Sequence, residues 1–283
     1  MLLAPPTEHL SIRVARAKDD TASFVAHQYA TYPFRLSNSL RLDPHNLDRV
    51  YAYIMNASPG VLAGDNLHLK VEVGDRAQLY LTDQSATKVY SKPAGGNSAQ
   101  VTWDLKVGAE AYLEFVPEPI ILFKAAAMTQ TMEVTIHPTG QLVLSERIIP
   151  GRLAREGAYS FEAFHSRLRI QSPTGKLYFA DNLRLLGQAN RFKLSPLFSR
   201  LPLLANFIVI APKISLERLT QALQQFDAPA DQLQVCESPL PGCDGLLVRA
   251  IASQTSLLEA YQHHLLNCVR QLLNHPPLPH IPK

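Results

Sequence analysis

Six carboxylate residues interrupt otherwise apolar segments of the sequence, and they are the side chains best suited to chemistry. They are Asp65, Asp83, Glu114, Glu118, Glu146 and Asp181. Carboxylates that line a water-filled passage would hold a divalent cation through weak, oxygen-rich coordination. Solvent-facing positions on strands are the more ordinary explanation of each single residue, so the pattern alone leaves both interpretations open.

Two pairs of residues have spacings that metal ligands sometimes show. Asp65 and His68 are three residues apart, which on a strand places them on opposite faces. His264 and Cys268 are four residues apart and would share one face of a helix. Cys268 also belongs to the apolar stripe of that helix, and an unpaired cysteine there is usually a core residue. Neither pair identifies a metal site, and the metal ligands stay unknown.

The cysteines and the last histidines give little further chemistry. Cys236, Cys243 and Cys268 cannot all pair, and none belongs to a Cys-x-x-Cys motif. This argues against a disulfide framework and favours a reducing compartment, so we expect a cytoplasmic protein. His275 and His280 lie in a proline-rich segment, where a closed metal site is not expected.

The composition excludes several classes of protein. The chain has 283 residues, of which 46% are hydrophobic and 18% are charged, and this excludes an intrinsically disordered protein. Lys plus Arg minus Asp plus Glu is 27 − 24 = +3, with the basic residues scattered, so we expect no nucleic-acid partner. The longest apolar stretch, residues 201–212, is too short to span a bilayer, so we expect no membrane partner.

Most of the chain has apolar residues at every second position, which is typical of strands with one buried face. Residues 66–73 and 101–107 show this most clearly, and Gly, Pro and Asn turns separate such runs about every ten residues. The turns at residues 73–77 and 107–111 resemble each other and indicate stacked hairpins. The pattern therefore predicts a mainly β body.

The last quarter of the chain changes to helical spacing. Ser215 can cap a helix in which Leu216, Leu219 and Leu223 share a face, and residues 254–273 form the clearest helix. Residues 207–210 and 246–251 read as buried strands between the two helices. We find no linker and therefore predict a single domain over residues 1–283, with a partly mobile tail over residues 1–20.

Three segments are richer in polar, glycine and proline residues than a plain strand requires: residues 58–65, 81–90 and 113–123. No phosphate-binding Gly-rich loop, Gly-x-Ser-x-Gly elbow or His-Glu-x-x-His pair accompanies them. A polar run held between strands suggests a surface of fixed shape for recognition. A network of hydrogen-bonded turns is the structural alternative.

In order and spacing, these segments resemble the urease accessory protein family UreD, also called UreH. The family pattern is Ser-Pro-Gly, Gly-Asp, Thr-x-Gln-x-x-x-Lys-Val-Tyr and Leu-Glu-x-x-Pro-x-Pro. Here it corresponds to residues 58–60, 64–65, 82–90 and 113–119, and residues 151–157 are similar to a downstream Gly-Arg-x-x-Arg-Gly-Glu segment. The resemblance covers about residues 24–273.

The resemblance implies a role without catalysis. Family members form a complex with UreF and the GTPase UreG, dock on the urease apoprotein and assist nickel insertion, and are thought to conduct Ni²⁺ through an internal passage. It also implies an elongated body of stacked strands, β-helix-like or superhelical, with two α-helices in the C-terminal region. No tightly bound cofactor is expected, and contact with Ni²⁺ would be transient.

By the same resemblance, six residues are assigned to a partner-binding surface or to the lining of the passage. They are Asp65, Thr82, Gln84, Lys88, Glu114 and Glu118. Gly60 and Gly64 are assigned to loop shape because glycine tolerates positive φ. Hydrogen bonds that stabilise turns are the alternative role for each of the six.

Two alternative functions stay open at this level. One is a β-rich metal-dependent hydrolase with a carboxylate site near Asp65 and Asp83. The other is a module that binds a polymer or peptide through the surface of residues 82–90. Catalytic turnover by the purified chain would favour the first alternative.

Overall fold

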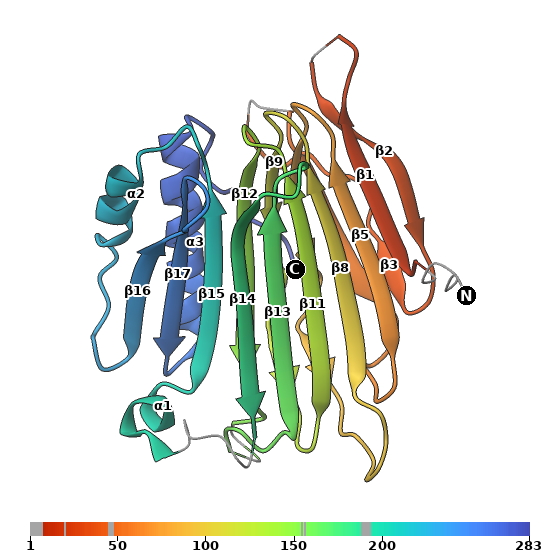
Figure 1. Ribbon diagram of the computed structural model, residues 1–283, viewed down its shortest axis with the longest axis vertical. Coiled ribbons are helices and arrows are strands. Elements are labelled where there is room, and N and C mark those ends of the chain that lie inside the picture. Colours follow the sequence, from red (N-terminus) through yellow and green to blue (C-terminus); the bar gives the residue numbers. More distant parts are fainter. Residues whose placement is uncertain (1–7, 20, 45–47, 154, 156, 188–193) are drawn as a thin grey trace.

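The computed structural model describes residues 8–19, 21–44, 48–153, 155, 157–187 and 194–283. In it, a seven-stranded sheet lies over a ten-stranded sheet, and the ten-stranded sheet extends beyond it on the side that carries the helices (Figure 1). Residues 154 and 156 of the segment 151–157, which carries part of the family pattern, lie outside the described residues.

The strands of the two sheets were predicted as a class by the alternating pattern. The seven-stranded sheet has, in spatial order, β14 (Leu177–Leu186), β13 (Ala163–Gln171), β11 (Ala127–Ile136), β8 (Ala99–Val107), β5 (Asn66–Val73), β1 (Leu10–Arg16) and β2 (Ser23–Ala30). The path of the ten-stranded sheet is β16 (Leu233–Pro239), β17 (Gly245–Ala252), β15 (Leu203–Ile210), β12 (Gln141–Ile149), β9 (Tyr112–Phe115), β6 (Gln78–Asp83), β4 (Val50–Asn56) and β3 (Phe34–Leu36). The short strands β10 (Ile120–Leu122) and β7 (Thr87–Val89) pair with each other, and β10 also pairs with β12.

The central strands alternate between the two sheets along the chain. β5, β8 and β11 are parallel neighbours in one sheet, and β6, β9 and β12 are parallel neighbours in the other. The turns that connect them stack, because the N–H of Gly108 donates to the carbonyl of Val73 at 2.8 Å and that of Ala109 to Asp75 Oδ1 at 2.8 Å. A Cβ on Gly108 would lie 2.5 Å from Asp75 Oδ1, so this close approach requires glycine.

The mainly β class is confirmed, but the β-helix-like body is not. Antiparallel strands flank the parallel centre of each sheet, so both sheets are mixed, and the strands form no closed barrel. The resemblance of two turns correctly indicated stacking, yet stacking extends only over the centre of the fold. Two mixed sheets facing each other are the more accurate description.

Both expected helices are present. They are α2 (Leu216–Leu223) and α3 (Thr255–Leu272), and the Ser215 side chain caps α2 by accepting from the N–H of Arg218. A short helix, α1 (Pro196–Arg200), the edge strand β16 and the strands β1 to β4 were not predicted. The helix α1 is short, and β16 lacks a clear apolar alternation.

The first residues differ from the expected mobile tail. β1 lies between β2 and β5, with ladder partners on both sides and Leu10 and Val14 buried. Residues 1–7 and 20 lie outside the described residues.

The apolar side chains form two cores. One fills the space between the sheets, with Leu79, Leu105 and Leu144 among its members. The other lies between the ten-stranded sheet and the helices, where Phe207 of β15 contacts Tyr261 of α3 with ring centroids 5.9 Å apart. The central strands of the ten-stranded sheet, such as β9, β12 and β15, therefore have two buried faces, which explains the long apolar runs at residues 142–144 and 207–210.

A buried network of charges fixes α3 to the ten-stranded sheet. Arg270 donates from Nε and Nη2 to the two carboxylate oxygens of Glu114 at 2.8 and 2.6 Å, and both side chains are fully buried. Arg49 Nε lies 3.6 Å from Glu114, and Arg49 Nη1 donates to Asp43 Oδ2 at 3.0 Å. The Tyr112 hydroxyl also donates to Glu114 at 2.8 Å. These hydrogen bonds fix the orientation of α3 on the sheet, in addition to the apolar contacts between them.

We expect Arg270→Met to lower the free energy of unfolding by about 3–5 kcal/mol, because Glu114 would lose its bidentate partner while remaining buried. Urea denaturation followed by circular dichroism measures the change. The matched control is Arg218→Met on the exposed side of α2, for which we expect a change within about 0.5 kcal/mol. Equal effects of the two substitutions would show that the buried network does not stabilise the fold.

Candidate functional site

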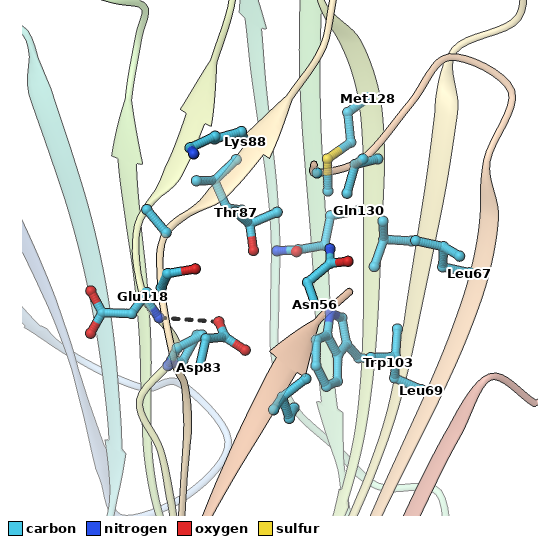
Figure 2. A pocket seen from close by; sticks show the side chains of 18 of the residues that line it. Asn56, Leu67, Leu69, Asp83, Thr87, Lys88, Trp103, Glu118, Met128 and Gln130 are labelled. Atoms are coloured by element: carbon cyan, nitrogen blue, oxygen red, sulfur yellow. Dashed lines mark hydrogen bonds between the residues drawn. The ribbon is translucent and has the colours of Figure 1, made fainter. Parts of the chain in front are cut away.

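A cavity of about 220 Å³ lies between the two sheets, where polar side chains lie among residues of the apolar core. We call it the main cavity. Figure 2 shows side chains of its lining, with Thr87 and Lys88 on one side, Leu67 and Leu69 on the other and Trp103 below Asn56. The lining comes from strands of both sheets and from loops next to them, so the stacking of the sheets positions the groups that lie on strands.

The exposed lining residues define the mouth of the main cavity. They are Asn56, Pro59, Ser85 and Lys88, from the end of β4, the loop after it and the β6–β7 region. Gly60 also lines the cavity, and a Cβ there would lie 2.2 Å from the carbonyl oxygen of Lys88. The loop can approach β7 this closely only with glycine, which agrees with the shape role expected for Gly60.

Asp83 is a carboxylate of the main cavity whose pKa lies near neutrality. Its Oδ2 accepts from the backbone N–H of Glu118 at 3.1 Å, as the dashed line in Figure 2 marks. Burial raises the pKa of Asp83 to about 7, although the hydrogen bond from Glu118 opposes the rise. Asp83 therefore changes its charge within the physiological pH range.

Glu118 lies on the wall of the main cavity and is already paired. Its carboxylate accepts from Lys283 Nζ and lies 3.5 Å from Arg147 Nη2. In Figure 2 the Glu118 side chain points away from Asp83. Lys283 also donates to the Thr82 hydroxyl at 3.3 Å and to the Asp83 carbonyl at 3.1 Å, so it ties the end of β6 to the segment after β9.

Glu146 lies at the inner end of the main cavity and is buried among neutral hydrogen-bond donors. Gln130 Nε2 and Ser166 Oγ donate to its Oε1 at 2.8 and 2.6 Å, and Asn206 Nδ2 donates to its Oε2 at 3.1 Å. Burial raises the pKa of Glu146, which the donors partly oppose and the negative charge of Asp181 reinforces. Among the described residues we find no cationic side chain paired with Glu146.

A second cavity, of about 20 Å³, adjoins the first on the far side of Glu146. We call it the small cavity, and its volume suits about one water molecule. Gln130, Met132 and Glu146 line both cavities, and we call these three residues the neck. Asp181 and Asn206 line the small cavity only. Together, the main cavity, the neck and the small cavity form what we call the inter-sheet route.

The residues expected from the sequence divide into two groups. Lys88, Glu118 and Gly60 line the main cavity, together with Asp83. Thr82 and Glu114 lie buried on strands of the ten-stranded sheet but do not line it, and Glu114 belongs to the ion-pair network with Arg270. Burial raises the pKa of Glu114, but the two guanidinium groups outweigh burial and hold it at about 2. The role of Glu114 in the structure is thus to anchor α3.

The other expected residues lie outside the main cavity. Asp65 Oδ2 accepts from the backbone N–H of Leu62 at 2.8 Å and closes a turn, in which Gly64 has a φ of +82°. Gln84 is exposed, and its backbone N–H donates to the carbonyl of Ile54 at 2.9 Å. Asp65 and Asp83 are not both part of this cavity, so the structure provides no shared carboxylate site for the hydrolase alternative.

His264 and Cys268, the pair with helical spacing, lie where α3 packs against α2. His264 Nε2 lies 3.0 Å from the carbonyl of Ala222 and 3.5 Å from Cys268 Sγ, at the contact of α2 with α3. Within the described part of the chain, no group of three or more His, Cys, Asp or Glu side chains is arranged to hold a metal ion. The polar residues of the inter-sheet route offer carboxylate and amide oxygens at several separate places instead.

Sequence comparisons assign this chain to a class of proteins. A family model described as UreD urease accessory protein matches residues 7–283. A urease accessory protein UreD from Trichodesmium erythraeum is 43% identical over 98% of this chain and 99% of its own length. One from Haloarcula marismortui is 31% identical over 95% of this chain and 88% of its own length.

These matches define the class as urease accessory proteins, which implies a part in urease maturation and a non-enzymatic role. The chain belongs to the UreD family. Among the helices that the structure describes, none has the length and apolar character needed to cross a membrane.

We expect the substitution Asp83→Asn to stabilise the protein more at pH 8 than near pH 5. Because folding raises the pKa of Asp83, the folded chain binds this proton more tightly than the unfolded chain between about pH 4 and pH 7. The contribution of Asp83 to stability therefore falls as the pH rises through that interval, whereas asparagine carries no charge at either pH. Urea denaturation at both pH values measures the difference.

Asp104→Asn is the matched control, because Asp104 is exposed on β8 and we expect the same small effect at both pH values. A constant difference between Asp83→Asn and the wild-type chain at pH 5 and pH 8 would contradict a raised pKa at Asp83.

Proposed function

We propose that this chain is a scaffold in urease maturation that turns over no substrate of its own. In this proposal it forms a complex with UreF and UreG, docks on the urease apoprotein and lets Ni²⁺ pass through the inter-sheet route to the metallocentre. The observation that carries the proposal is Glu146, a buried carboxylate at the neck with only neutral donors around it.

The chemistry of the route supports transit of Ni²⁺. Imidazole and thiolate ligands bind Ni²⁺ tightly and would trap it, whereas carboxylate, amide and water oxygens bind it weakly enough to release it. The route offers Asp83 in the main cavity, Glu146 at the neck and Asp181 in the small cavity. A cation at Glu146 would replace the missing positive partner of a buried carboxylate, which lowers the cost of its burial.

The route combines carboxylates with structural rigidity. Gln130 and Ser166 are ladder partners on β11 and β13, and Glu146 and Asn206 are ladder partners on β12 and β15. Glu146 and its three hydrogen-bond donors are thus held by strands of two facing sheets rather than by loops. Rigid walls keep the oxygens at fixed spacing, so a cation moves past them without reorganising the protein.

The surface supports a role as a scaffold for other proteins. Phe24 and Tyr29 of the edge strand β2 and Tyr32 just after it are 45%, 46% and 65% exposed. Exposed aromatic side chains are enriched in protein interfaces, and β2 also presents an unpaired sheet edge. This surface supports partner binding but does not say which partner binds there.

Co-expression tests the assembly directly. With UreF, UreG and the urease apoprotein present, we expect this chain to co-purify with them as one complex. Omitting only this chain should leave urease abundant but free of nickel. Full nickel content of urease at limiting nickel in the absence of this chain would contradict the proposal.

A substitution at the neck tests the route. We expect Glu146→Gln to lower urease activation at limiting Ni²⁺ about tenfold, because a lost interaction between a cation and a charged oxygen is worth about 1.4 kcal/mol or more. Excess Ni²⁺ should restore part of the activity. The measurement is urease activity and nickel content after co-expression at several nickel concentrations.

Glu133→Gln is the matched control, since Glu133 is on the same strand as Gln130 but on its other face, and we expect it to behave like the wild-type chain. Thermal unfolding of each variant excludes a loss of the fold. Wild-type activation by Glu146→Gln at limiting Ni²⁺ would exclude the inter-sheet route as the path of the metal.

A further inference from the structure

The small cavity ends at a carboxylate that bridges the two sheets. Asp181 lies on β14, which pairs with β13 and is an edge strand among the strands that the structure describes. Across from it lie Asn206 of β15 and Leu247 of β17, which line the same cavity from the ten-stranded sheet. The inter-sheet route therefore ends where the edge of one sheet lies over the other.

Arg249 of β17 forms an ion pair with the carboxylate of Asp181. Its Nη2 lies 2.7 Å from each oxygen of Asp181, and it is a hydrogen-bond donor to Oδ2. Arg249 is the ladder partner of Asn206, which in turn is the ladder partner of Glu146, so these three side chains form one row across the inner face of the ten-stranded sheet. The row leads from the neck directly to the ion pair.

The exposure of the pair suits a contact that opens and closes. The side chains of Arg249 and Asp181 are 49% and 26% exposed, whereas those of the Arg270–Glu114 pair are fully buried. An ion pair as exposed as Arg249–Asp181 is weak and is screened by salt, and any carboxylate that approaches the guanidinium competes with Asp181 for it. When the ion pair is formed, Arg249 places a positive charge at the narrow end of the inter-sheet route and neutralises the charge of Asp181.

We propose that the Asp181–Arg249 pair is a latch on the narrow end of the inter-sheet route, so that Arg249 controls the exit of a divalent cation there. The inference rests on the proposed transit of Ni²⁺ and adds a residue that regulates it. With the latch closed, a cation leaves through the mouth of the main cavity, and with the latch open, it leaves through the small cavity as well.

Release of Ni²⁺ from the purified full-length chain to a colorimetric chelator, followed by stopped flow, tests the latch. We expect Arg249→Gln to release Ni²⁺ about two- to fivefold faster than the wild-type chain at low ionic strength, the range that an exposed ion pair provides. The difference should disappear at high ionic strength, because salt opens the latch of the wild-type chain. Arg249→Lys keeps the charge and should retain slow release at low salt.

Arg184→Gln is the matched control, because Arg184 is exposed on the same strand as Asp181 but on the opposite face, and we expect wild-type release at both ionic strengths. Equal release rates for Arg249→Gln and Arg184→Gln would overturn the latch, as would slower release by Arg249→Gln with an unchanged melting temperature. The absence of Ni²⁺ binding to all variants would also overturn it. The Glu146→Gln experiment tests the inter-sheet route separately from the latch. If Ni²⁺ does not use the route, the Glu146→Gln chain would activate urease like the wild-type chain.

Discussion

A carboxylate removed from water needs hydrogen-bond or charged partners, and Glu114 and Glu146, the two buried glutamates of the described residues, have partners of opposite kinds. Glu114 receives two guanidinium groups and a tyrosine hydroxyl, and its pKa falls to about 2. Glu146 receives only amide and hydroxyl donors, and its pKa rises. A permanent positive partner makes the first a structural anchor, whereas its absence leaves the second available to a mobile cation.

The two glutamates lie on neighbouring strands of the ten-stranded sheet but face opposite sides of it. Glu114 faces α3, and Glu146 faces the seven-stranded sheet. The sheet thereby separates the ion-pair network that holds the helix from the polar side chains that line the inter-sheet route. Destabilising the first layer would loosen the walls of the second, so the anchor and the route depend on each other through one sheet.

Local patterns in the sequence predicted most of the strands after residue 66, α2 and α3, but not β1 to β4 or β16. They also singled out the three segments 58–65, 81–90 and 113–123, parts of which line the main cavity. They could not predict the role of Glu114, because its partner Arg270 is 156 residues away and no short motif connects them. They identified Glu146 as one carboxylate among six but could not select it. Its donors come from β11, β13 and β15, and only the register of two facing sheets brings Gln130, Ser166 and Asn206 to one point.

The most direct measurement is nickel-edge anomalous diffraction from crystals of this chain in complex with UreF, soaked with Ni²⁺ at low concentration. The account predicts an anomalous peak between the two sheets, within coordinating distance of a carboxylate oxygen of Glu146. Peaks confined to surface histidines, with none in the main cavity, the neck or the small cavity, would contradict it.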